Sequence, residues 1–151
     1  MARGLESAVA RLLRASGYHV VGRRIIEGLE VDMYGVKVTR RGCRGVIVEM
    51  KVLYRDSLRV QVERRRWLAH RVYVALPDWS IVEALVSLPE WVGVIAYNPA
   101  TREADVLRKA VPQYSLLARL IAESIAVEEG LWPREFRGRR GNGVSGLVKR
   151  P

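Results

Sequence analysis

Hydrophobic residues at the start of the chain recur at the three- and four-residue spacing of one helix face. The positions with this spacing are Leu5, Val9, Leu12 and Leu13. The pattern stops at Ser16 and Gly17, and a glycine often ends a helix because it adopts the left-handed conformation without strain. We therefore predict a helix over residues 4–16, with Glu6 in its first turn.

Three segments rich in β-branched and apolar residues follow, and this composition favours strands. Residues 18–26 and 29–38 are separated by a short segment that contains Gly28, so we predict a hairpin. A polar turn over residues 39–45 then leads to a third strand over residues 46–53.

The rest of the chain alternates between helical and extended patterns. Asp56 and Ser57 are suitable N-cap residues for a helix that runs to about residue 70. The segments expected after it are a strand over 72–76, a helix over 80–88, strands over 92–97 and 103–107, and an amphipathic helix over 113–129. The order up to residue 76 is αβββαβ, which indicates an α/β fold extended by a helix, two strands and a C-terminal helix.

The length of 151 residues fits one domain, which we place at residues 1–132. Residues 133–151 differ in composition, because they contain four glycines, six basic residues and few apolar ones. We predict that they form a flexible basic arm.

Positive charge is concentrated in two parts of the chain. Residues 1–76 hold 16 basic and seven acidic side chains, residues 77–132 hold four and eight, and residues 133–151 hold six and one. This distribution suits binding of a polyanion such as a nucleic acid, because Lys and Arg contacts release counterions from phosphates. The alternative interpretation is a solvated, heat-adapted surface.

The sequence also argues against several protein classes. No apolar stretch approaches the roughly 20 residues that span a bilayer, and the N-terminus lacks the apolar segment of a signal peptide. We therefore expect a cytoplasmic protein without membrane contact. The single cysteine, Cys43, cannot form an internal disulfide, and we expect it in a loop.

The third predicted strand carries two charged residues, Glu49 and Lys51, in an otherwise apolar segment. Because alternate residues of a strand share a face, their side chains point the same way. Asp32 has a comparable position in the second strand, with Glu30 on the same face. If these two strands are neighbours, Asp32 and Glu49 converge, and repulsion between their carboxylates favours a bound divalent cation such as Mg²⁺, with Mn²⁺ as an alternative.

The combination of Asp32 with Glu49-Met50-Lys51, on an αβββαβ order of elements, resembles the PD-(D/E)xK (restriction-endonuclease-like) nuclease superfamily. This superfamily includes restriction enzymes, archaeal Holliday-junction resolvases and RecB-type nucleases. The resemblance covers about residues 4–76 and implies a restriction-endonuclease-like core with a mixed central sheet. Val31 precedes Asp32 where the motif has proline, which is a departure from the pattern.

The resemblance also assigns roles to individual residues. It implies that Asp32 and Glu49 are metal-binding carboxylates and that Lys51 is the catalytic lysine. Glu6 matches an acid that many members use for a further metal or water contact, and Gln61 matches a glutamine found in several branches. Glu30 competes with Asp32 as the ligand. The alternative for Glu49 and Lys51 is an exposed charge pair on a sheet.

Two functions remain open at this point. The first is a metal-dependent endo- or exonuclease that hydrolyses DNA in repair, recombination or restriction, with RNA not excluded as a substrate and a homodimer possible through the helix over 113–129. The second is a nucleic-acid-binding module with the same fold that is non-catalytic or that depends on a larger assembly. The arginines proposed to contact phosphates are Arg40, Arg41, Arg44, Arg55, Arg59, Arg64, Arg65 and Arg66.

Overall fold

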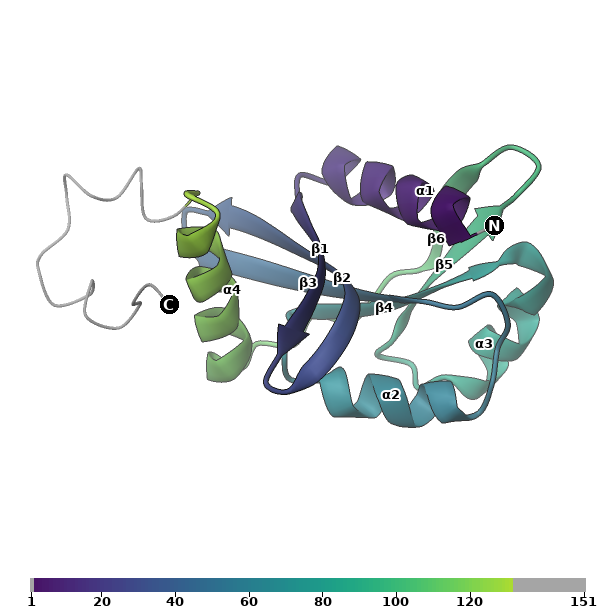
Figure 1. Ribbon diagram of the computed structural model, residues 1–151. Helices are drawn as coiled ribbons and strands as arrows, with labels where there is room; N and C mark the ends of the chain where they lie inside the picture. The colour runs from purple at the N-terminus through teal and green to yellow at the C-terminus, as the bar shows by residue number, and fades with distance from the viewer. Residues whose placement is uncertain (1, 132–151) are drawn as a thin grey trace, which may run out of the picture.

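Six strands form one mixed sheet whose order in space follows their order along the chain (Figure 1). The computed structural model describes residues 2–131. The strands are β1 His19–Ile26, β2 Leu29–Thr39, β3 Gly42–Met50, β4 Arg71–Pro77, β5 Gly93–Asn98 and β6 Glu103–Arg108. Neighbours from β3 to β5 are parallel and the other neighbours are antiparallel. The predicted α/β fold is therefore confirmed, as a mixed sheet.

Helices cover both faces of this sheet (Figure 1). They are α1 Ala2–Ala15, α2 Ser57–Arg65, α3 Ile81–Ser87 and α4 Leu116–Glu128, with a short 3-10 turn at Asp78–Ser80. Helix α1 packs on one face, whereas α2, α3 and α4 pack on the other. None of the helices between residues 2 and 131 is both long and apolar enough to cross a membrane.

The alternation of side chains along β2 and β3 separates two cores. Met33 and Val48 are buried against α1, while Tyr34 and Ile47 are buried on the side of α2 and α4. Because residues two apart in a strand share a face, Asp32 and Glu49 point to the same side as Tyr34 and Ile47. The two carboxylates therefore face the α2 layer.

Strand β3 begins earlier than the hydrophobic pattern predicted. It starts at Gly42 and pairs with the end of β2, so that Val38 lies opposite Cys43. The expected loop position of Cys43 is wrong, since the residue is fully buried in the strand. The pairing of β2 with β3 reaches this far because Cys43 and the alternate residues after it lie on the face of β3 that packs in the core. Strand β3 also ends earlier, at Met50.

The boundaries of the helices differ from the prediction as well. Helix α1 begins at Ala2, so Glu6 lies beyond its first turn. Helix α2 ends at Arg65, and Asp56 makes no side-chain cap hydrogen bond. Helix α4 begins after Ser115, whose hydroxyl accepts a hydrogen bond from the backbone N–H of Ala118. The predicted arm over residues 133–151 lies outside the described residues.

Helix α4 completes the core, and its C-terminal end also fixes the β1–β2 hairpin. Ala122 and Ile125 are buried against the sheet. Arg24 of β1 contacts both carboxylate oxygens of Glu128 at 2.9 Å. His19, at the start of β1, contacts Glu129 at 2.9 Å. The hairpin is therefore held against the C-terminal end of α4 by polar contacts of two β1 residues, His19 and Arg24.

We predict that Gly45→Ala destabilises the protein by about 1–3 kcal/mol. A Cβ atom at residue 45 would overlap the buried ring of Tyr34. Urea denaturation of the wild type and the variant measures the difference. In a Tyr34→Ala background the same substitution should cost much less, because the overlapping ring is absent. An equal cost in both backgrounds would show that Tyr34 does not pack over Gly45.

Candidate active site

Strands β2 and β3 separate at the end of the sheet that carries the predicted acidic residues. The last residue pair that they share is Met33 with Val48. Beyond it, β2 stays paired with β1, while β3 stays paired with β4. Asp32 and Glu49 are the first residues of each strand past the shared pairing. We call this point, defined by Asp32 and Glu49, the strand fork.

The two carboxylates of the strand fork replace the backbone hydrogen bonds that are lost there. The backbone N–H of Asp32 donates to Oε2 of Glu49 at 3.2 Å. The backbone N–H of Met50 donates to Oδ2 of Asp32 at 2.8 Å. Each side chain therefore satisfies a donor on the opposite strand, which a separated pair of strands would otherwise leave without a partner. These bonds also fix the direction of both carboxylates.

Glu49 is a buried acid whose charge is only partly compensated. The residue is 2% exposed, whereas the side chain of Asp32 is 18% exposed. Burial raises the pKa of Glu49 above its ordinary value, and the negative charge of Asp32 raises it further. The charges of Arg65 and Lys51 and the N–H of Asp32 act in the opposite direction without cancelling this shift.

Arg65 of α2 supplies the positive charge closest to Glu49. Its Nε lies 3.3 Å from Oε2 of Glu49, although the N–H has no well-aligned acceptor, so the contact is an ion pair without a good hydrogen bond. Its other nitrogens donate to the backbone oxygen of Gln61 at 2.7 Å and of Glu30 at 2.8 Å. Arg65 thus joins α2 to both strands of the fork.

The burial of Arg65 corrects the expectation that it contacts phosphates from the surface. Only 8% of the residue is exposed. The helical spacing contained a signal for this, because Leu58, Val62 and Arg65 share one face of α2 and all three are buried. An arginine on the apolar face of a helix requires an acidic partner, and Glu49 is that partner.

Lys51 follows directly after the last residue of β3. Its backbone N–H donates to the oxygen of Ala75 at 3.0 Å, which extends the pairing with β4 by one residue. The side chain forms no ion pair within residues 2–131, and its charge lowers the pKa of Glu49. Asp32, Glu49 and Lys51 are therefore together at one end of the mixed sheet.

The other two residues implied by the resemblance have different positions. Glu6 is exposed on α1, which covers the opposite face of the sheet. Gln61 lies on α2, one turn before Arg65, and its side-chain oxygen is buried without a hydrogen-bond partner. Glu30, which the sequence left as an alternative to Asp32 for metal binding, accepts a hydrogen bond from Arg23 at 3.2 Å. Arg23 also approaches Asp32, at 4.0 Å.

The donor set of the strand fork fits a small divalent cation. Within the described range, no group of three or more His, Cys, Asp and Glu side chains is arranged to hold a metal. Asp32 and Glu49 alone are sufficient for Mg²⁺, which often binds one or two carboxylates and completes its shell with water and substrate phosphate. Burial raises the pKa of Glu49 and the negative charge of Asp32 raises it further, and a bound cation would offset both effects.

The remaining arginines of the prediction divide into two groups. Arg44 lies 3.4 Å from the ring of His70 and over the ring of Tyr114, and Arg66 lies between two tryptophan rings. These two support the fold. His70 also has a structural role, since it accepts a hydrogen bond from the backbone of Gly45 at 3.1 Å, and burial lowers its pKa to about 4. The exposed arginines of the set are Arg40, Arg41, Arg55, Arg59 and Arg64.

Comparisons with known proteins show the fold but no function. No protein-family model and no curated protein matches the chain. One solved structure is similar over 93% of both chains, with a TM-score of 0.64 and 24% sequence identity, and it is described as the SPO1766 protein of unknown function from Silicibacter pomeroyi. At this identity the similarity is evidence for a shared fold alone.

We predict that the stability of Glu49→Gln relative to the wild type increases as the pH rises above 4.5. Because the pKa of Glu49 in the folded state is raised from 4.5, its ionised form is disfavoured there, and stability falls as the pH rises from 4.5 to the raised value. The variant does not lose stability in this way, because glutamine does not ionise. The thermal unfolding midpoint of the variant minus that of the wild type should be larger at pH 7 than below pH 4.5, whereas the loss of the partner of Arg65 lowers the variant's midpoint at both pH values. A difference that is independent of pH would contradict the prediction.

We predict that Arg65→Met destabilises the protein by about 3–5 kcal/mol, because it leaves Glu49 buried without a counter-charge. The double variant Arg65→Met/Glu49→Gln should recover much of this stability. Arg64→Met, at an exposed neighbouring position, is the control and should change stability little. Urea denaturation measures all four proteins. If the double variant is no more stable than Arg65→Met, the ion pair is not the source of the effect.

Proposed function

We propose that the protein is a metal-dependent nuclease that hydrolyses phosphodiester bonds in DNA. The observation that carries this proposal is the strand fork, where two carboxylates from neighbouring strands converge and one of them is buried. A buried acid with a raised pKa is costly for the fold, and such groups are concentrated at functional sites. Lys51, directly after β3, adds an ammonium group that can stabilise negative charge on the phosphate during hydrolysis.

The arrangement of elements supports the finer assignment to a restriction-endonuclease-like core. The order α1-β1-β2-β3-α2-β4 agrees with the αβββαβ order of the PD-(D/E)xK superfamily. The acids lie on the second and third strands of that order, as the resemblance implies. The basic N-terminal half of the chain further supports a polyanionic substrate.

The residues of the fork have separate tasks in this proposal. Asp32 and Glu49 would hold Mg²⁺ or Mn²⁺, which when bound polarises a phosphoryl oxygen and lowers the pKa of water. Lys51 offers three N–H donors to the negative charge that develops on the phosphate. Arg65 keeps Glu49 oriented and anchors it to α2. The hydrogen bonds from the opposite strands hold both carboxylates in place before substrate arrives.

A second candidate function is a DNA-binding module that has this fold but does not cleave. The observation in its favour is the ion pair between Arg65 and Glu49, which compensates the buried acid without any metal. In such a module the only task of Asp32 and Glu49 would be to accept the backbone hydrogen bonds that hold β2 and β3 where they separate. Lys51 would then be one phosphate contact among several.

We predict that Glu49→Gln, Asp32→Asn and Lys51→Ala each reduce Mg²⁺-dependent DNA cleavage by orders of magnitude. The first two remove a negative charge needed to hold the cation, and their affinity for DNA without metal should stay equal or increase. Lys51→Ala should leave metal binding intact, because an ammonium group is not a metal ligand. Cleavage and DNA affinity are measured in parallel on branched, linear and single-stranded substrates.

Two exposed residues far from the fork provide matched controls for this experiment. Glu83→Gln on α3 and Lys109→Ala after β6 repeat the chemical changes and should retain wild-type cleavage. Undiminished cleavage by Glu49→Gln would disprove the proposed site. A wild type that binds DNA but cuts none of the substrates with Mg²⁺ or Mn²⁺ would favour the second function.

A further inference from the structure

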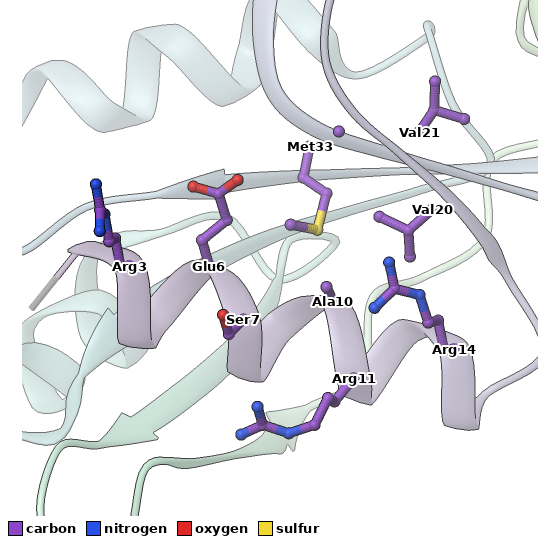
Figure 2. Close-up of a pocket in the computed structure, with 10 residues that line it drawn as sticks. Arg3, Glu6, Ser7, Ala10, Arg11, Arg14, Val20, Val21 and Met33 are labelled. Carbon is purple, nitrogen blue, oxygen red and sulfur yellow. The ribbon is translucent and has the colours of Figure 1, made fainter.

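A surface groove of about 700 Å³ lies between α1 and the strands β1 and β2 (Figure 2). One wall is helix α1 and the other is formed by residues 20–22 of β1 together with Met33 of β2. The polar side chains that line it are Arg3, Glu6, Ser7, Arg11 and Arg14. This groove is on the sheet face opposite to α2, and none of its arginines is among those predicted to contact phosphates.

The arginines of the groove form a stripe along α1. Arg3, Arg11 and Arg14 are spaced so that they share one helix face with Ser7. With a rise of 1.5 Å per residue, the stripe is about 17 Å long, a length over which one strand of B-DNA carries about five phosphates. The stripe therefore matches several consecutive phosphates of one strand.

Two of these arginines have no partner in the described part of the chain. Arg3 and Arg14 are exposed, and neither side chain forms an ion pair or hydrogen bond within residues 2–131. Arg11 differs, because one of its nitrogens donates to the backbone oxygen of Arg102 at 2.7 Å. Guanidinium groups bind phosphate oxygens in a bidentate geometry, so Arg3 and Arg14 are available for such contacts.

The opposite wall of the groove is open at one backbone position. Gly22 lies at an irregularity in the β1–β2 pairing and has a φ of 83°. No atom lies within 4 Å of the place where its Cβ would be. A glycine in a bulge lets a ligand approach the backbone closely.

The groove reaches β2 one residue after the strand fork, on the opposite face of the sheet. Met33, which lines it, directly follows Asp32 on β2. Figure 2 shows the carboxylate of Glu6 rising from α1 on the side of Met33, between Arg3 and Arg14. Glu6 is the one acid among the ten residues that line the groove, so it opposes an anion there unless a cation accompanies it.

We infer that this groove binds the phosphodiester backbone of one strand of the DNA substrate, with Arg3 and Arg14 as phosphate contacts. The inference rests on the proposed function for the identity of the polyanion. It places the strand along α1, with residues 20–22 and Met33 on the other wall of the groove. Ser7 adds a neutral hydrogen-bond donor in the middle of the stripe.

The test measures binding of labelled single-stranded and duplex DNA in EDTA, so that no cleavage is needed. Arg3→Gln, Arg14→Gln and the double variant are titrated at several salt concentrations. Each substitution should weaken binding to all sequences and reduce the slope of log K against log salt by about 1. The matched control is Lys109→Gln, an exposed charge at the end of β6 that should leave the slope unchanged.

Glu6→Gln gives an independent signature of the groove. Removing the acid should tighten binding in EDTA, because one repulsion against the phosphates is lost. Wild-type slopes in the double variant, or an equal loss in Lys109→Gln, would overturn the inference. If the groove variants bind DNA normally while the wild type cleaves it, the inference about the groove is wrong and the proposed nuclease function is retained. If the groove variants lose binding but the wild type never cleaves DNA, the groove is a DNA-binding site and the proposed nuclease function is wrong.

Discussion

A backbone N–H group that is partly shielded from water needs a hydrogen-bond acceptor, and this requirement governs the strand fork. Where β2 leaves β3, the N–H groups of Asp32 and Met50 lose the acceptors that a continuous sheet would provide. The carboxylates of Asp32 and Glu49 take that place across the gap. The sheet can open at this end because these two side chains are acids of suitable length. The side chains of Asp32 and Glu49 therefore allow β2 and β3 to separate, and they also place two negative charges at the same point.

The same solution creates an electrostatic problem. Two acids at one point, one of them 2% exposed, repel each other, and burial adds to the cost of their charge. Arg65 reduces this cost from α2, and Lys51 contributes from the end of β3. The compensation is incomplete, since the pKa of Glu49 stays raised. The cation and phosphate proposed to bind here would offset this cost.

Arginines in this chain serve two different purposes that composition does not separate. Arg44, Arg65 and Arg66 are occupied inside the structure, by a histidine, an acid and aromatic rings. Arg3 and Arg14 project into a groove without partners in the described residues. A positive net charge therefore says that a polyanion would be attracted, whereas the direction of each side chain decides where it would bind.

The sequence by itself determined the order of elements and the hairpin, because helical and strand periodicities are local properties of the chain. The proximity of Asp32 was an inference from assumed strand pairing. Only the tertiary structure decided that β3 begins at the turn with Cys43 inside it, since strand ends depend on pairing partners. It also decided that Arg65 compensates Glu49, because a contact between residues 16 positions apart depends on how α2 packs on the sheet.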